Sequence, residues 1–125
     1  MTKRKSIENG RAEAAFRYVQ DVKNKSFADS YKSYVKRLAA QIKANGLGNT
    51  LAFVYSKTKE DEDAYSSIYE QLEDWLKKKN LVKKSLLDEI LSVDSKKYKY
   101  ITKETLALLN WWRRFVDGEI ESKDD

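Results

Sequence analysis

Positively charged side chains stand beside aromatic side chains at two places in the sequence. The segment 31–37 reads Tyr-Lys-Ser-Tyr-Val-Lys-Arg, and the segment 111–114 reads Trp-Trp-Arg-Arg. Cations neutralise phosphates, and aromatic rings stack on bases that are not paired. Such residues could therefore bind a nucleic acid. A solvated basic surface around a packed core would use the same residue types, and these side chains alone leave both interpretations open.

The charged residues are distributed unevenly along the chain. The net charge is +5, with an excess of positive charge in residues 1–44 and 77–114. Residues 45–76 and 115–125 carry an excess of negative charge. Two basic segments that flank an acidic one could build one or two basic surfaces, which would suit a polyanionic partner.

The residue types that perform most catalytic chemistry are missing. The 125 residues include no histidine and no cysteine, which excludes disulfides, thiolate nucleophiles, a histidine base and most zinc sites. The acidic run Glu60–Asp63 could hold Mg²⁺, but we interpret it as the negatively charged start of a helix. The sequence Gly46-Leu47-Gly48 lacks the Lys-Ser/Thr pair of a nucleotide-binding loop and indicates a turn between helices. We therefore expect no catalytic residue, no metal site and no cofactor.

The elements that must position the basic residues are predicted to be helices. The chain has no proline and only four glycines, whereas a β-rich chain needs frequent turn residues. Apolar residues recur at helical spacing in several segments. We expect an all-α fold, a compact single-domain bundle of about six helices. With Thr58 and Thr102 as caps, the expected helices cover residues 6–24, 27–45, 51–57, 58–79, 84–93 and 102–118.

The segment 49–57 has almost no polar face. We therefore expect a short central helix, Leu51 to Lys57, that is buried on all sides and capped by Asn49 or Thr50. A strand would suit the same residue types, but no partner strand is visible elsewhere in the sequence. The segment 96–100 is expected to be an ordered basic connector.

One domain, residues 1–125, is expected to hold all of these elements. The basic N-terminus 1–5 and the acidic tail 119–125 are expected to be flexible. No apolar run approaches the roughly 20 residues that span a bilayer. We therefore expect a cytoplasmic protein that has no contact with a membrane and no small-molecule substrate.

The central part of the sequence resembles a known family. The runs Tyr34–Leu38, Asn45–Gly48 and Thr50–Phe53, followed by Ser56-Lys57, look like the signature of the small helical subunit of the Cmr effector complex. This complex is the type III-B CRISPR ribonucleoprotein that targets RNA.

Other parts of the chain support the same resemblance. Segment 64–76 is similar to the family's fourth helix, and segment 102–118 is similar to its closing helix. Arg11 and Ala15 stand where members of the family commonly have an arginine and an alanine. The resemblance thus covers nearly the whole chain.

The resemblance implies a non-catalytic structural subunit that acts in antiviral defence. Copies of the family's small subunit stack into a minor filament beside the backbone filament that holds the CRISPR RNA. The two filaments enclose the duplex of guide and target RNA, and the backbone subunit cuts the target. The implied partners are other Cmr subunits, copies of this chain, CRISPR RNA and target RNA.

Basic residues that cluster around these motifs are the expected phosphate contacts. They are Lys36, Arg37, Lys43, Lys57, Arg113 and Arg114, followed by Arg11 and Arg17. Such contacts read the backbone and shape of RNA and not its sequence. Trp111 and Phe115 lie on an apolar arc wider than one core contact needs, so we expect them at an interface with another subunit.

Two other functions remain open at this level. The chain could be a free-standing basic protein that binds RNA or DNA, which tight binding by the isolated chain at physiological salt would favour. It could also be an enzyme that uses carboxylates and a divalent metal, which metal-dependent nuclease activity requiring Asp61 and Asp63 would support.

Overall fold

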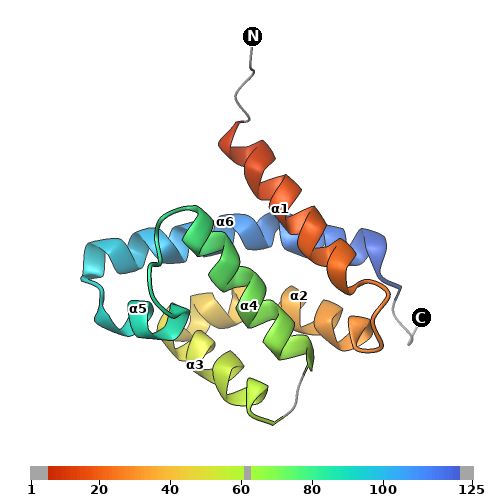
Figure 1. Cartoon of the computed structure of the whole chain (residues 1–125), viewed down its shortest axis with the longest axis horizontal. Coiled ribbons are helices and arrows are strands. Elements are labelled where there is room, and N and C mark those ends of the chain that lie inside the picture. Colours follow the sequence, from red (N-terminus) through yellow and green to blue (C-terminus); the bar gives the residue numbers. More distant parts are fainter. Residues whose placement is uncertain (1–5, 61–62, 122–125) are drawn as a thin grey trace.

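The protein folds into helices throughout the part of the chain that can be described. A computed structural model describes residues 6–60 and 63–121, and this part contains no strand. Its helices are α1 (Ile7–Val22), α2 (Ala28–Asn45), α3 (Leu47–Thr58), α4 (Asp63–Lys78), α5 (Leu86–Ser92) and α6 (Ser95–Glu119) (Figure 1). The predicted all-α bundle of about six helices is confirmed.

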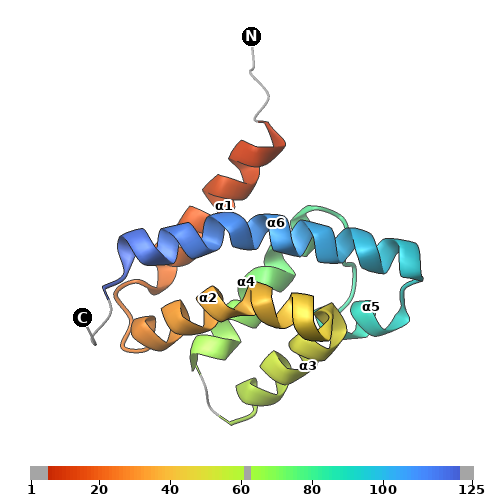
Figure 2. The ribbon, with the colours of Figure 1, turned by 180° about the vertical axis from the view of Figure 1, so that it is seen from behind.

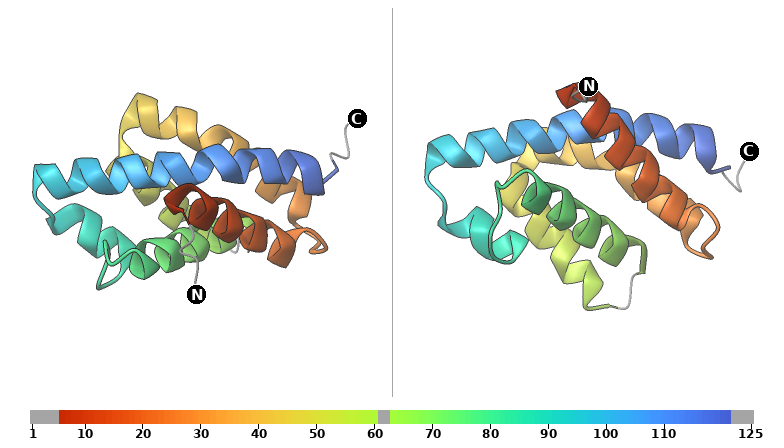
Figure 3. Two further views of the ribbon diagram at one scale, coloured as in Figure 1. Left: turned by 90° about the horizontal axis from the view of Figure 1, so that it is seen from above. Right: turned by 45° about the horizontal axis from the view of Figure 1, so that its top comes forward.

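Helix α6 runs along the length of the molecule, and α1, α2 and α4 pack against it. Helix α1 crosses α6, while α2 lies beside α6 on the rear face (Figure 2). Seen from above in the left view of Figure 3, α2 and α4 lie to either side of α6, and beneath α6 they pack against each other. Helix α3 packs against α2, α4 and α5. The core lies between these helices and includes the fully buried side chains of Leu51, Leu72 and Trp112.

Two side-chain caps fix where helices begin. The Ser6 side chain accepts a hydrogen bond from Asn9 N over 3.0 Å and starts α1. The Asp94 side chain accepts one from Lys97 N over 2.8 Å and starts α6. Each cap satisfies a backbone N–H that has no partner inside the helix.

Gly46 forms the sharp turn that joins α2 to α3. Its backbone has φ 86° and ψ 158°, a conformation that is essentially restricted to glycine. Its N–H donates to Ile42 O over 2.7 Å and ends α2. Gly48 follows in the first turn of α3, where its N–H donates to the Tyr98 hydroxyl over 2.8 Å. A Cβ at Gly48 would lie 3.4 Å from that hydroxyl, so glycine permits a close approach between α3 and α6.

The prediction of a central helix buried on all sides was wrong. Helix α3 begins at Leu47, and neither Asn49 nor Thr50 caps it. Its buried residues lie on one face: Leu47, Thr50, Leu51 and Val54. Phe53 is 39% exposed and Tyr55 is 37% exposed. The helix is therefore half-buried, and aromatic rings stand on its open side.

Two other element boundaries differ from those predicted. The expected connector 96–100 is the first part of α6, and the Thr102 hydroxyl donates to Tyr98 O inside that helix instead of capping it. Thr58 ends α3 and donates to Tyr55 O over 2.6 Å, whereas α4 begins at Asp63. The bounds of α1, α2 and α5 differ from the expected ones by at most two residues.

The C-terminal end of the described chain is held against the core. Glu119 is the last residue of α6, and the next residue, Ile120, is 5% exposed. The Lys32 ammonium donates to Ile120 O over 2.8 Å. Flexibility was expected from residue 119 onward; in the structure Glu119 belongs to α6 and Ile120 makes the contacts just described. Residues 1–5 and 122–125, also expected to be flexible, lie outside the described part.

In the described ranges, no helix combines the length and apolarity required to cross a lipid bilayer.

Candidate nucleic-acid interface

Two of the predicted phosphate contacts lie where α2 runs beside α6. The Lys36 ammonium lies 2.8 Å from an Asp117 carboxylate oxygen, so this ion pair joins the two helices. Arg113 precedes Asp117 by one helical turn and is exposed, which places it on the same side of α6. Lys36 and Arg113 therefore belong to one surface at the junction of α2 and α6, called the α2–α6 surface below. The two helices lie side by side in Figure 2.

Two further predicted contacts stand beside aromatic rings at the open side of α2 and α3. The Arg37 guanidinium carbon lies 5.4 Å from the centroid of the Tyr34 ring. The Lys57 ammonium lies 5.7 Å from the centroid of the Phe53 ring and 3.3 Å from a Glu60 carboxylate oxygen. Tyr65 connects these two pairs, because it stacks on Tyr34 with centroids 3.9 Å apart and meets Phe53 edge-on at 5.8 Å.

Lys43 and Arg114 are exposed but belong to neither pair. Lys43 lies in the last turn of α2, two turns after Lys36, so the two lysines share one face of that helix. Arg114 is adjacent to Arg113 on α6 but points about 100° away around the helix axis. It therefore lies on a neighbouring face of α6 and not on the face of Arg113.

Arg11 forms ion pairs with carboxylates of its own chain. Its guanidinium donates two hydrogen bonds of 2.9 Å each to the Glu104 carboxylate on α6, and it also pairs with Glu8. The Glu104 side chain is 4% exposed and accepts a third hydrogen bond from Trp75 Nε1 over 3.1 Å. Burial raises the pKa of Glu104, but hydrogen bonds from Arg11 and Trp75 outweigh it and hold the pKa below the ordinary value of a glutamate. Two of the five guanidinium N–H donors are therefore committed to a buried carboxylate.

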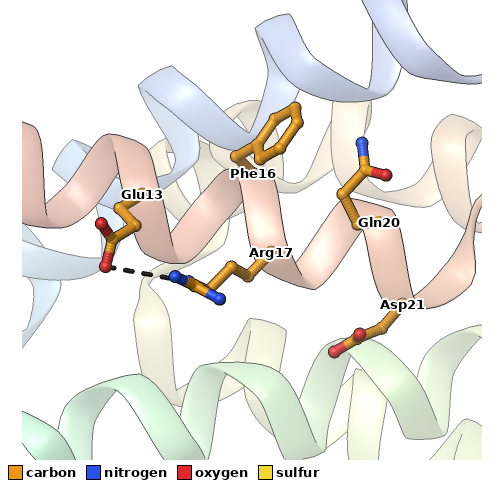
Figure 4. A pocket seen from close by; sticks show the side chains of 5 residues that line it. All are labelled: Glu13, Phe16, Arg17, Gln20 and Asp21. Carbon is orange, nitrogen blue, oxygen red and sulfur yellow. Dashed lines mark ion pairs between the residues drawn. The ribbon is translucent and has the colours of Figure 1, made fainter.

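Arg17 lies on a different side of the molecule, on the outer surface of α1. Figure 4 shows it in a shallow hollow with Glu13, Phe16 and Gln20. Its side chain is 72% exposed, and its Nε lies 3.7 Å from a Glu13 carboxylate oxygen. Helix α1, which carries Arg17, lies on the opposite side of α6 from α2 in the left view of Figure 3.

An aromatic cluster joins α1 to α6 near the same place. Trp111 stacks on Phe115 with centroids 6.2 Å apart, and Phe115 meets Phe16 edge-on at 5.3 Å. The Trp111 Nε1 donates to a Glu8 carboxylate oxygen over 2.8 Å. Trp111 and Phe115 are half-buried, whereas Phe16 is 41% exposed. The predicted interface residues thus belong to a cluster whose open part is Phe16.

The strongly perturbed tyrosines have structural roles. Burial raises the pKa of Tyr31, whose hydroxyl donates to Gln71 Oε1 over 2.6 Å and accepts from Trp112 Nε1 over 2.8 Å. Burial and the hydrogen bond to Asp74 raise the pKa of Tyr18. In the part of the chain that the structure describes, no three acidic residues come together in a way that could hold a metal ion.

The eight predicted basic residues thus do not form a single patch. Lys36, Lys43 and Arg113 share the α2–α6 surface, and Arg37 and Lys57 flank the aromatic rings of α2 and α3. Arg114, Arg11 and Arg17 stand elsewhere. Sequence reasoning missed Phe16 as a surface residue, because its spacing fits the buried face of α1. It also missed the contact of Tyr34 and Phe53 with Tyr65, since no pattern in the sequence pairs these rings.

Comparisons with known proteins agree with this architecture. Residues 7–119 match the model of a family described as CRISPR-associated protein (Cas_Cmr5). A similar solved structure is the X-ray crystal structure of a CRISPR-associated Cmr5 family protein from Thermus thermophilus. The match has a TM-score of 0.81 and 22% sequence identity, and it covers 94% of this chain and 100% of that chain. At this level of identity, the similarity establishes a shared fold.

Proposed function

The chain belongs to the CRISPR-associated Cmr5 family, and on this premise we propose that it is a non-catalytic structural subunit of a type III-B CRISPR complex. In this proposal, copies of the chain form a minor filament beside the backbone that holds the guide RNA. The subunit contacts the guide and target RNA, acts in the cytoplasm and contributes to antiviral defence. The observation that carries the proposal is the family match over residues 7–119.

The α2–α6 surface supports the RNA contact. Lys36, Lys43 and Arg113 are exposed on neighbouring helices, so a phosphate backbone that follows the junction of α2 and α6 could meet all three. Asp117 partly neutralises Lys36 in the free chain. An RNA phosphate would compete with Asp117 for that lysine, which makes the contact weak and sensitive to salt.

The aromatic cluster of α1 and α6 supports a contact with another subunit. Phe16 adds exposed apolar area to the half-buried rings of Trp111 and Phe115. Aromatic residues are enriched at protein interfaces, where they bury a large area with little loss of side-chain freedom. We therefore place Trp111 and Phe115, together with Phe16, at the contact with a neighbouring copy or with the backbone subunit.

Charge reversal in a reconstituted complex tests the RNA contact. The variant Lys36→Glu/Arg113→Glu should weaken target-RNA binding. Its log affinity should also fall less steeply with log salt, with the magnitude of the slope reduced by about 1 to 2. The control is Lys25→Glu/Lys83→Glu, which makes the same charge change at exposed lysines in loops outside α2 and α6. If both variants bind target RNA like the wild type at low salt, this surface does not contact RNA.

Phe16→Ala tests the subunit contact, because Phe16 is exposed and its loss removes little of the core. Fewer copies should enter the complex, as measured by native mass spectrometry. Unchanged copy number in both Phe16→Ala and Trp111→Ala complexes would assign the cluster to the fold of the single chain. RNA cleavage by the purified chain alone, tested with and without divalent metal, would overturn the proposed lack of catalysis.

A further inference from the structure

A small hollow lies where α2 and α3 diverge from the turn at Gly46. It is lined by Gln41 and Asn45 of α2 and by Asn49, Thr50 and Phe53 of α3. Its volume is about 250 Å³. Whole small-molecule ligands occupy pockets of roughly 300–1,000 Å³, so this hollow suits one planar group of a larger ligand.

The polar lining of the hollow consists of amides. Gln41, Asn45 and Asn49 each offer a carbonyl acceptor and an amide donor, and none of the three carries a charge. Amide side chains of this kind pair with the edges of nucleobases, as in bidentate contacts of Asn or Gln with adenine. A lining of amides therefore discriminates against an isolated phosphate and in favour of a group with both donors and acceptors.

Thr50, another residue that lines the hollow, has an unsatisfied polar atom. The residue is 2% exposed, and its hydroxyl has no hydrogen-bond partner, which holds for no other buried side-chain N or O atom in residues 6–60 and 63–121. A buried hydroxyl without a partner costs free energy, and such atoms are rare in folded proteins. A base edge in the hollow would bring donors and acceptors close to this residue.

An aromatic wall and two cations complete the arrangement. The Phe53 side chain lines the hollow and remains 39% exposed, so part of it is accessible to a base. Two cations lie next to the lining residues, one on each helix. Lys57 follows Phe53 by one turn of α3 and lies above its ring, and Arg37 precedes Gln41 by one turn of α2. Phosphates on either side of a base held in the hollow could meet these cations.

We propose that the hollow between α2 and α3 binds one unpaired RNA nucleobase, which stacks on Phe53 and is hydrogen-bonded by Gln41, Asn45 and Asn49, with Lys57 and Arg37 at the flanking phosphates. Base–aromatic stacking with cations along the backbone is a common way to bind single-stranded nucleic acid. This inference rests on the proposed RNA contact and adds a base contact to it. The expected contact tolerates different bases, because stacking supplies most of its free energy.

Photo-crosslinking in the reconstituted complex tests this site. Target and guide RNAs are prepared with 4-thiouridine or with 6-thioguanosine, whose bases react on illumination with side chains in direct contact. Mass spectrometry of the digested complex should find RNA attached to the peptide that contains residues 41–53. The yield at this peptide should fall at least about fivefold in Phe53→Leu, since the lost stacking is worth that factor or more.

Two further variants make the result decisive. Asn45→Ala changes an exposed residue and should also lower the yield, so the test does not depend on the folding of Phe53→Leu. Tyr100→Leu alters an exposed ring on α6 and should leave the yield at residues 41–53 unchanged.

The crosslinking outcomes separate this site from the proposed RNA contact. A wild-type complex without crosslinks at residues 41–53, or yields unaffected by both Phe53→Leu and Asn45→Ala, would overturn the base site. If Lys36→Glu/Arg113→Glu still weakens RNA binding in that case, the backbone contact stands and only the base site fails. If neither set of variants has an effect, the proposed RNA contact fails as well.

Discussion

The pair of Arg11 and Glu104 permits a quantitative test of whether Arg11 serves the fold. Replacing Arg11 by methionine keeps most of the aliphatic stem but leaves the Glu104 carboxylate, 4% exposed, with Trp75 Nε1 as its remaining donor. Removing one partner of a buried ion pair costs about 3–5 kcal/mol. Because the Arg11 side chain is 19% exposed and water can reach the site, we expect a loss of about 3 kcal/mol in the free energy of unfolding.

The second substitution in the cycle tests the cause of this loss. Glu104→Gln, added to Arg11→Met, removes the uncompensated charge and keeps an amide oxygen that can accept from Trp75 Nε1. The double variant should therefore recover part of the stability, by about 1 kcal/mol or more. The free energies come from urea unfolding followed by circular dichroism at 222 nm, with linear extrapolation. The control Arg17→Met changes an arginine on the same helix that is 72% exposed, and it should stay within about 0.5 kcal/mol.

The pH dependence of the free energy of unfolding provides an independent test of the role of Arg11. In the wild type, the pKa of Glu104 is lowered, so its contribution to stability is present above the ordinary glutamate pKa and is lost as the pH falls through the folded-state value. In Arg11→Met, burial without the arginine should raise this pKa, so protonation of Glu104 as the pH falls favours the folded state. The difference in stability between wild type and variant should therefore shrink between pH 7 and pH 4. A loss below 1 kcal/mol, or a difference that does not change with pH, would refute the structural role of Arg11.

Three further predictions concern the packing of individual helices. Gly46→Ala forces a side chain into the glycine conformation of the α2–α3 turn and should lower the free energy of unfolding by about 1–3 kcal/mol. Gly10→Ala, inside α1 with open space around it, should raise the free energy of unfolding by about 0.5–1 kcal/mol. Equal effects of the two variants in urea unfolding would contradict this account of the turn. Tyr98→Phe removes the hydroxyl that accepts from the first turn of α3, so it should cost about 1 kcal/mol and speed hydrogen exchange of the Gly48 amide, and unchanged exchange would show that the contact is not formed. Lys32→Met removes the hydrogen bond to the carbonyl of residue 120 and should increase exchange and proteolysis at the end of α6, which limited proteolysis with mass spectrometry can detect.

The all-helical fold class and most helix bounds could be predicted because they depend on local sequence patterns. The apolar residues of α4 recur at helical spacing, and its buried side chains are those the spacing selects. The start of α3 could not be predicted in this way. Gly46 and Gly48 resemble a loop, yet only Gly46 forms the turn, while Gly48 is inside the helix because the Tyr98 hydroxyl approaches it. That contact joins residues far apart in the sequence.

The candidate site shows the same limit. Lysines and arginines near aromatic residues could be recognised in the sequence, but their partners could not. Arg11 pairs with Glu104, and Lys36 with Asp117, across separations that no periodicity reveals. Exposure of Phe53 depends on which side of α3 the neighbouring helices leave open, and this is a property of the whole bundle. Residue types therefore indicated which side chains could bind RNA, and tertiary packing decides which of them are exposed at the surface.

The fixed position of Ile120 has a practical consequence for protein engineering. Its side chain is buried in the core, and its carbonyl accepts a hydrogen bond from the Lys32 ammonium. A shortened chain that ends before this residue would therefore expose apolar surface and leave the ammonium without this acceptor. A fluorescent protein or purification tag joined immediately after α6 would disturb the same contacts of residue 120. Fusions should start beyond residue 121, with a flexible spacer, if the attached cargo is not to disturb the bundle.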